Sequence, residues 1–499
     1  MKIKSINISN ILFLTLLTII IFYGIVGCYH NYFFHTGFFC DEACLVKNIT
    51  EKKWFELFLP LNYGQCCPPL FLIFSKIIYN FFGLNERALT IINFSASILS
   101  ILTFYFLSAK IFKNKLSILF SMFLFVFSDE KICSFFLYFK QYASDVLFSI
   151  VLILLFLYLK NKKLTNSHLF LLSLLAIFIS FASYTAIFII FILILYWIIK
   201  YLDKKCFWQN TRNSLFFLIP YLSTMVVFFY INCLPNINNV FLQSFWSGNT
   251  QTEIFYPQSF SQLKTLIVFF SGNVSHDVYL ILFLLVFSIY KLFKKDKSLL
   301  YVLVTPFVLG AFLGFFHFYP FAPQRISLYL IPLFILLISY PFEYCKFDLL
   351  NFSIKQYTLS IILIIVLFQT LKIPSVIKLA NKNLLDTEVL SWAVTKQFTE
   401  VLVKSDITNN DYILGDSISY CVFDIYDYNN KLNKNNILYV YNGFPPKEIK
   451  KGDNIYFFIR KIPDSQYQHV VEWINNKNNC KIIYQIDGYY GKFTKCEVL

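Results

Sequence analysis

Long apolar runs alternate with short charged segments over the first three quarters of the chain. Several runs reach about 20 residues, the length that an α-helix needs to cross the hydrocarbon core of a bilayer. The predicted spans cover residues 11–28, 89–112, 116–128, the stretch that follows segment 139–145 and ends before residue 160, two short helices within 169–199, then 215–232, 278–293, 299–316, 326–340 and 357–371. The pattern predicts a polytopic α-helical membrane protein with about 11 transmembrane helices.

The charged segments predict the direction in which each span crosses the membrane. Lysines flank the apolar stretch 169–199 on both sides, so we expect two crossings with a break at residues 182–185. The loop 233–277 carries a single basic residue, Lys264, which is typical of an outside loop. We therefore expect the N-terminus in the cytoplasm and the C-terminus outside the cell membrane. A signal peptide is the alternative for residues 11–28, but this run is long for a signal sequence.

The composition changes after residue 372, where Asn, Asp and Lys become frequent and the apolar runs shorten. Residues 411–414, 437–441, 455–459 and 481–485 are β-branched and aromatic stretches bounded by turn residues, which is typical of strands. The sequence predicts a transmembrane domain over residues 1–372 and a small extracytoplasmic α/β domain over residues 373–499.

Composition excludes several classes of function. Hydrophobic residues make up 57% of the chain and charged residues only 14%, against about 25% charged in soluble domains. The net charge of +15 lies in clusters between apolar runs, so it indicates topology and not a nucleic-acid partner. The 12 Cys and six His show no metal-ligand spacing, and nucleotide-binding and zinc-peptidase motifs are missing. We expect no metal and no cofactor.

The segment 31–83, between the first two predicted spans, holds the first candidate chemistry. It begins with the acid pair Asp41-Glu42, continues as an amphipathic stretch that we expect to lie along the membrane interface, and includes Tyr63 and Gln65. A carboxylate within hydrogen-bond reach of an acceptor hydroxyl can remove its proton. The competing interpretation is structural, because acidic residues are favoured in the first turn of a helix.

Two further polar groups stand where spans begin. Lys140, Gln141 and Tyr142 precede the fourth span, and Asp145 lies inside it. Lys140 can extend to the interface without any other role, whereas Asp145 needs a polar partner or water.

Arginines supply the other candidates. Arg325 follows an aromatic outside loop that contains Tyr319, and Arg87 follows segment 31–83. A guanidinium binds phosphate through two parallel hydrogen bonds. An ion pair with an acidic loop residue explains Arg325 equally well, and a lipid-headgroup anchor is the alternative for Arg87.

Taken together, these motifs resemble those of the GT-C glycosyltransferases, of the glycosyltransferase family 39, protein O-mannosyltransferase and aminoarabinose-transferase type. The matching pieces are Asp41-Glu42-Ala43, Tyr63-Gly64-Gln65, Pro68-Pro69-Leu70, Glu86-Arg87-Ala88-Leu89, the segment 139–145, Ser183-Tyr184-Thr185-Ala186, Tyr319-Pro320-Phe321 with Arg325, and the segment 328–332. Cys66-Cys67 and Thr185 depart from the family pattern and leave fine specificity open.

The resemblance implies an inverting hexosyl or pentosyl transfer from a polyprenyl-phosphate sugar on the extracytoplasmic side. Asp41 would act as the base and Glu42 would orient it or the acceptor, while Lys140, Arg325 and Arg87 would hold the donor phosphate. Six residues of the same motifs are expected to bind substrate: Tyr63, Gln65, Gln141, Tyr142, Asp145 and Tyr319. The acceptor would be an envelope glycan, a lipid or a protein.

Two other functions remain open at this point. A transporter or flippase for a lipid-linked sugar would be expected to show inverted repeats and broken helices, and the sequence shows no repeat. A non-catalytic protein of envelope polysaccharide assembly is the other alternative.

Overall fold

A computed structural model describes residues 8–34, 37–38, 40–127, 138–162, 165–202, 207–239, 242, 260–271, 278–316, 318–344, 411–415, 437–439, 454–460, 480–487 and 491–499. Its contacts divide the chain into two units. The first consists of Met1–Phe33, Lys53–Ile78 and Thr90–Asn383, and the second of Phe34–Lys52, Tyr79–Leu89 and Leu384–Leu499. The division at residue 372 stays a prediction.

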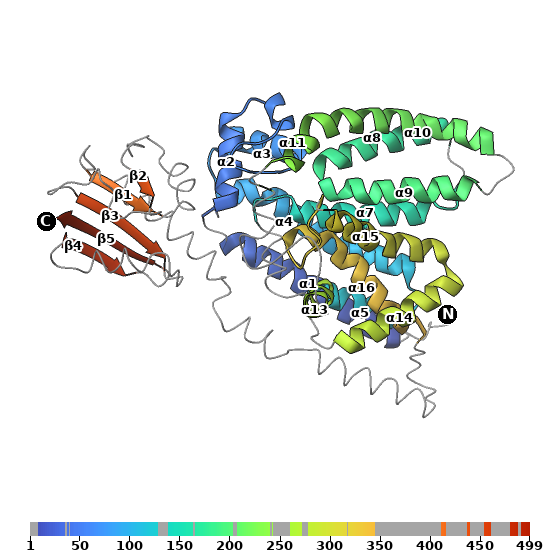
Figure 1. Ribbon diagram of the computed structural model, residues 1–499. Coiled ribbons are helices and arrows are strands. Elements are labelled where there is room, and N and C mark those ends of the chain that lie inside the picture. Colours follow the sequence, from blue (N-terminus) through green and yellow to red (C-terminus); the bar gives the residue numbers. More distant parts are fainter. Residues whose placement is uncertain are drawn as a thin grey trace, which may run out of the picture. The chain divides into compact units, whose positions relative to one another are not determined.

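Helices joined by short loops make up the described part of the first unit (Figure 1). They are α1 (Ile8–Phe34), η1 (Phe55–Phe58), α3 (Pro69–Phe82), α4 (Glu86–Ile111), α5 (Lys115–Val126), α7 (Tyr142–Leu159), α8 (Asn166–Ala182), α9 (Tyr184–Leu202), α10 (Phe207–Phe228), the π-helix η2 (Phe229–Cys233), α11 (Leu234–Ile237), α13 (Phe260–Phe270), α14 (Val278–Lys295), α15 (Lys297–Phe315), η3 (Arg325–Leu330), α16 (Ile331–Ser339) and η4 (Tyr340–Tyr344). The C-terminal end of α3 and the N-terminal end of α4 belong to the second unit.

Six stretches of these helices are long and apolar enough to cross a membrane: Asn10–Tyr29, Glu86–Ile111, Tyr142–Leu159, Leu215–Ile237, Lys297–Phe315 and Arg325–Tyr344. The prediction of a helical membrane protein is therefore confirmed. Helices α5, α8, α9 and α14 occupy four further predicted spans. The span 357–371 lies outside the described residues, so the number of eleven crossings and their orientation stay predictions.

The predicted break within residues 169–199 is present. Ser183 adopts an extended conformation with φ −155° and ψ 118°, which ends α8 at Ala182, and α9 begins at Tyr184. Helices α8 and α9 pack together, and α10 lies along α8 (Figure 1). The break leaves the Ser183 side chain at a helix start, where it is available to hydrogen-bond.

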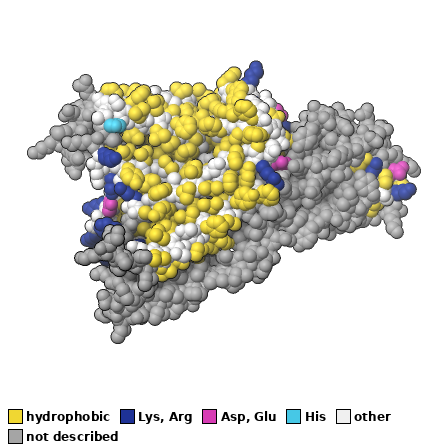
Figure 2. Space-filling model, turned by 180° about the vertical axis from the view of Figure 1, so that it is seen from behind, with side chains coloured by type: hydrophobic (Ala, Val, Ile, Leu, Met, Phe, Trp, Pro, Cys, Tyr) yellow, Lys and Arg dark blue, Asp and Glu magenta, His cyan; other side chains and the backbone are white. Residues whose placement is uncertain are grey.

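The arrangement of apolar side chains fits a membrane environment. All nine residues of α16 are buried, so this helix forms the centre of the bundle. On the outer helices large apolar side chains are exposed, as with Phe22 at 66% and Phe283 at 66%. In Figure 2, hydrophobic side chains cover most of the visible helical surface, with Lys and Arg side chains towards its edges.

The second unit contains α2 (Cys40–Glu51) and a five-stranded sheet of β1 (Asp411–Gly415), β2 (Ile437–Tyr439), β3 (Asn454–Arg460), β4 (Cys480–Asp487) and β5 (Gly491–Val498). The strand order is β2-β1-β3-β5-β4. Strand β1 pairs in parallel with β2 and β3, while β5 pairs antiparallel with β3 and β4. Strands occur at all four predicted segments, but the connecting residues lie outside the described ones, and the α/β character stays a prediction.

Candidate active site

The turn that leads into α7 is held by a side chain of α4. Asn93 is fully buried and donates from Nδ2 to the carbonyl oxygens of Tyr138 and Lys140, the latter at 2.8 Å. The Lys140 N–H donates to the Tyr138 carbonyl at 2.6 Å and closes the turn. Lys140 is thereby fixed just before the first turn of α7, where helix N–H groups favour an anion.

The Lys140 ammonium is buried and lacks a carboxylate partner among the described residues. The residue is 5% exposed, and its Nζ donates to Gln65 Oε1 at 2.5 Å. The two salt bridges of the described residues involve other lysines. An ammonium has three protons to donate, and a buried cation is costly without a counter-ion. The surroundings of Lys140 therefore favour an anionic ligand.

The loop that carries Gln65 is tied to α7 and α9. The Cys67 thiol donates to Gln141 Oε1 at 3.3 Å. The Tyr184 hydroxyl, at the start of α9, lies 3.0 Å from the Cys67 carbonyl oxygen. These contacts place Gln65 and Gln141, two of the predicted substrate-binding residues, beside Lys140.

The π-helix η2 bonds both to η1, which precedes this loop, and to Tyr184. Asn232 is 2% exposed, and its Nδ2 donates to the Phe58 carbonyl at 2.8 Å. Its Oδ1 lies 2.7 Å from the Tyr184 hydroxyl, whose single proton is shared with the Cys67 carbonyl. The extra residue of a π-turn often accompanies a functional site. In this chain the π-turn contains Asn232 itself, whose side chain reaches the Phe58 carbonyl and the Tyr184 hydroxyl.

Backbone strain is present in the same loop. Tyr63 has φ +61° and is followed by Gly64 with φ +61°. Residues other than glycine rarely adopt a positive φ, and residues with such strained backbones cluster at functional sites. The Gln65 N–H donates to the Asn62 carbonyl at 3.3 Å and closes the turn. Tyr63 is 39% exposed and Gln65 only 6%, so only Gln65 enters the buried cluster.

Asp145 links α7 to the break between α8 and α9. Its carboxylate accepts a hydrogen bond from Ser183 Oγ at 2.5 Å. Ser183 Oγ also accepts the Ala186 N–H at 3.2 Å and lies 3.2 Å from Thr185 Oγ1. Asp145 thus has the polar partner that its position in an apolar run required. Its predicted substrate-binding role is not tested by these contacts.

Arg325 lies at the same end of α7 as Lys140. The guanidinium carbon is 5.7 Å from the ring centroid of Tyr142, the first residue of α7. Such a stack orients a guanidinium. The structure therefore brings together two cations that are far apart in the sequence.

The loop before Arg325 is packed firmly. The Tyr319 hydroxyl donates to the Ile326 carbonyl at 2.5 Å, and its ring meets the Phe188 ring edge-on at 5.0 Å. Burial raises the pKa of Tyr319 well above its usual value, so the hydroxyl keeps its proton at neutral pH. Phe321 fits against Gly310, where a Cβ would come within 2.8 Å of the ring.

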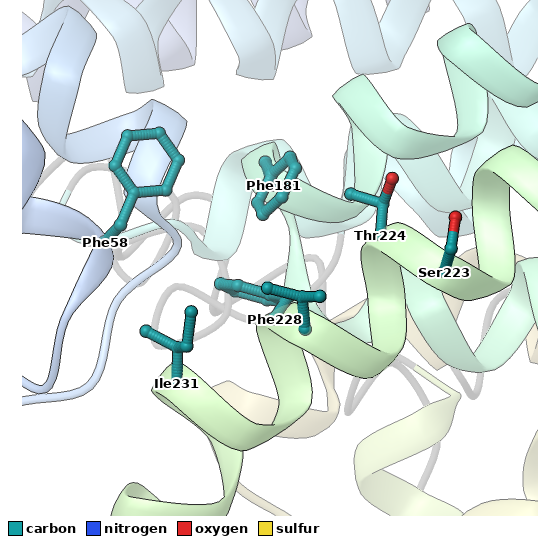
Figure 3. Close-up of a pocket in the computed structure, with 7 residues that line it drawn as sticks. Phe58, Phe181, Ser223, Thr224, Phe228 and Ile231 are labelled. Atoms are coloured by element: carbon teal, nitrogen blue, oxygen red, sulfur yellow. The ribbon is translucent and has the colours of Figure 1, made fainter.

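An open apolar cavity of about 510 Å³ adjoins the polar cluster. It is lined by Phe58, Phe181, Ser223, Thr224, Val227, Phe228 and Ile231 (Figure 3). Phe181 contacts both Phe58 and Phe228, with ring centroids 5.7 and 4.7 Å apart. Phe228 also stacks on Tyr184 at 6.1 Å. Tyr184 therefore contacts a lining residue of the cavity through its ring and the polar cluster through its hydroxyl.

Other chemistries find little support. Burial raises the pKa of Cys66 to about 11, so this thiol is protonated at neutral pH and is a poor nucleophile. In the described ranges, no three His, Cys, Asp or Glu residues form a group that could hold a metal ion.

The acid pair and Arg87 belong to the second unit. Asp41 and Glu42 lie in the first turn of α2, and Glu42 is 1% exposed. Arg87 is exposed in the first turn of α4. Their first-turn positions suit both interpretations of the acid pair, so the roles of all three stay predictions.

Comparisons with known proteins place the fold. The chain is similar in structure to ArnT from Cupriavidus metallidurans bound to undecaprenyl phosphate, with a TM-score of 0.52, 9% identity and 98% of each chain covered. It is also similar to the archaeal oligosaccharyltransferase AglB from Archaeoglobus fulgidus, in complex with an inhibitory peptide and a dolichol-phosphate. That likeness has a TM-score of 0.50 and 10% identity, and covers 84% of this chain and 64% of AglB.

No protein-family model matches the sequence, and no curated protein matches it. Both structural neighbours are GT-C glycosyltransferases, so the predicted GT-C fold is confirmed. At these identities the likeness shows the fold alone.

Proposed function

We propose that the chain is a membrane glycosyltransferase that moves a sugar from a polyprenyl-phosphate donor to an acceptor hydroxyl on the extracytoplasmic face. The observation that carries this proposal is the buried Lys140 ammonium, without a carboxylate partner among the described residues, at the same end of α7 as Arg325. The fold is shared with two proteins that were solved with a polyprenyl phosphate bound.

The two cations suit the chemistry at the donor phosphate. When the bond between the anomeric carbon and the phosphate oxygen breaks, its electrons remain on the polyprenyl phosphate as added negative charge. Lys140 would stabilise this charge as a point cation and Arg325 through a two-pronged contact. Fixed cations in a water-poor site lower the barrier to such a step. Arg87 is a third candidate from the family resemblance.

An inverting transfer also needs a base for the acceptor. The acceptor oxygen attacks the anomeric carbon from the face opposite the phosphate, and its proton passes to a carboxylate. We assign the base to Asp41 and the orienting role to Glu42. This assignment rests on the resemblance of the Asp41-Glu42-Ala43 motif, since a place in the first turn of α2 suits a structural role equally well.

The apolar cavity supports a lipid-borne donor. One of its lining residues, Phe228, stacks on Tyr184, whose hydroxyl donates to the Cys67 carbonyl in the loop that carries Gln65. A ligand with a charged head and a long apolar chain would match these two neighbouring environments. We place Tyr63, Gln65, Gln141, Tyr142, Asp145 and Tyr319 among the residues that surround the donor or acceptor, as the resemblance implies.

Substitution of Arg325 tests the phosphate contact. Arg325→Ala should weaken polyprenyl-phosphate binding about 10- to 100-fold, the scale of a lost charged hydrogen-bond partner. Arg325→Lys should recover only part of this affinity, because an ammonium cannot make the two-pronged contact. The affinity can be measured by titrating purified protein in nanodiscs with a fluorescent polyprenyl phosphate.

Lys264→Ala is the matched control, because Lys264 is an exposed lysine of α13 in the same unit. The Lys264→Ala variant should bind polyprenyl phosphate with the wild-type affinity. If Arg325→Ala also binds polyprenyl phosphate like the wild type, Arg325 does not contact the phosphate and serves only to pack on Tyr142.

A further inference from the structure

Four lysines gather at the corner between α14 and α15. Lys291, Lys294 and Lys295 lie in the last two turns of α14, and Lys297 begins α15. Lys294, Lys295 and Lys297 are exposed and Lys291 is half-buried. In the predicted topology this corner faces the cytoplasm. We call these four residues the lysine corner.

The acidic residue within the corner is already engaged. Asp296 forms a salt bridge with Lys160 at 2.9 Å and accepts hydrogen bonds from Ser298 Oγ at 2.5 Å and from the Leu299 N–H at 3.0 Å. Burial acts to raise the pKa of Asp296, but these three donors outweigh it and hold that pKa below its usual value. The Asp296 carboxylate therefore interacts with Lys160 and with the first turn of α15, and not with the lysine corner.

The acidic residue of η4 is engaged as well. The Glu343 carboxylate accepts the backbone N–H groups of Lys113 at 3.1 Å and Asn114 at 3.0 Å. No salt bridge joins the lysine corner to a carboxylate in the described part of the chain. The corner thus keeps a concentrated positive charge.

Aromatic rings lie beside three of these lysines without neutralising them. The Lys291 and Lys295 ammonium groups lie 5.0 and 5.5 Å from the centroid of the Tyr344 ring. The Lys297 ammonium lies 5.1 Å from the Phe293 ring. Aromatic rings beside cations are typical of side chains at the level of lipid headgroups.

An exposed apolar stripe leads along α14 to the same corner. Tyr279, Phe283, Val286, Tyr290 and Phe293 are 77%, 66%, 65%, 58% and 53% exposed. Their spacing of four and three residues places them on one face of the helix. The stripe is mostly apolar, and its last member, Phe293, lies directly before Lys294 of the lysine corner.

We propose that the lysine corner binds the headgroup of an anionic phospholipid, with the acyl chains along the apolar stripe of α14. The charge complementarity and the continuity of stripe and corner select this ligand. Anionic lipids of the cytoplasmic leaflet attract clustered Lys and Arg residues next to a membrane. The proposal is independent of the donor site, so it stands or falls separately from the proposed function.

The test compares lipid retention by the full chain and two charge variants. Each protein is purified from bilayers of equal phosphatidylglycerol and phosphatidylcholine content, and the lipids that remain bound are measured by mass spectrometry. Wild type should retain phosphatidylglycerol at least about fivefold over phosphatidylcholine, since four cations at the headgroup level each favour the anionic lipid. The variant Lys291→Gln/Lys294→Gln/Lys295→Gln/Lys297→Gln should lose this enrichment.

The matched control removes four other lysines near the same end of the bundle, as Lys110→Gln/Lys113→Gln/Lys115→Gln/Lys162→Gln. It should keep the enrichment. If both variants lose the phosphatidylglycerol enrichment equally, the effect comes from diffuse charge and the corner is not a lipid site. If the corner variant keeps the wild-type enrichment, the lysine corner does not bind the lipid. If the quadruple variant does not fold, the exposed pair Lys294→Glu/Lys297→Glu replaces it. Competition by inorganic phosphate at millimolar concentration would identify a free-anion site and overturn the lipid assignment.

Discussion

Asp41→Asn should leave the protein folded and able to bind the lipid donor, while the rate of sugar transfer falls by roughly 10²-fold or more. Asparagine has nearly the same size as aspartate, but its amide cannot take the acceptor proton. Loss of a first-turn charge costs the helix at most about 1 kcal/mol, which is too little to unfold α2. Initial rates with a polyprenyl-phosphate sugar and an envelope extract as acceptor measure the effect.

Two other carboxylate substitutions in α2 serve as comparisons for the transfer rate of Asp41→Asn. Glu42→Gln should reduce the rate less than Asp41→Asn, because we assign Glu42 an orienting role. Glu51→Gln removes a carboxylate from the last turn of α2, where it lies 4.0 Å from Lys47, and should leave the rate unchanged. If Asp41→Asn transfers sugar as fast as wild type, Asp41 only favours the start of α2 and another group is the base.

Lys140→Ala should abolish most donor binding without destabilising the ligand-free protein. The residue is 5% exposed, and its ammonium has a neutral amide as its hydrogen-bond partner. A buried cation of this kind adds little stability before an anion arrives. We expect an unchanged or higher melting temperature without ligand, and a loss of about 10- to 100-fold in affinity for polyprenyl phosphate.

Melting temperature and donor affinity together distinguish a residue that contacts the ligand from one that only stabilises the fold. Lys76→Ala is the control, because Lys76 is also buried in the first unit but lies over the Trp54 ring, 5.7 Å from its centroid. This variant should keep its affinity for polyprenyl phosphate. If Lys140→Ala melts at a much lower temperature and the surviving folded protein binds the donor normally, Lys140 is a structural residue.

The helices were predictable because their signals are local. Apolar length predicted α1, α4 and α7, and the polar residues around Ser183 predicted the break between α8 and α9. Each of these features depends on a few adjacent residues and on the solvent around them. The full number of spans remains a prediction because residues 357–371 are not described.

The site was only partly predictable. Lys140 and Arg325 were selected because each stands at the outer end of a predicted span and belongs to a motif of the resembled family, and the structure places both at one end of α7. Asn93 and Asn232 are polar residues within apolar helices, which is itself a signal, but they were missed. Their partners lie 45 and 174 residues away in the sequence, and the pattern of one helix does not reveal a distant partner.

The apolar cavity could not be predicted at all. Phe58, Phe181 and Phe228 are ordinary members of apolar runs, and only the packing of η1 against α8 and α10 makes them line one space. A run of Phe residues predicts burial or lipid contact equally well. The side on which the rings leave a space depends on the tertiary structure.

The fate of a doubly labelled donor tests the central claim most directly. Purified wild-type protein in liposomes receives a polyprenyl-phosphate sugar with one label on the sugar and another on the lipid, together with an envelope extract. We expect the sugar label to move to an acceptor with inverted anomeric configuration, and the lipid label to be recovered as polyprenyl phosphate in equal amount. Movement of both labels across the bilayer on one intact molecule, with no new glycosidic bond, would contradict it and identify a transporter.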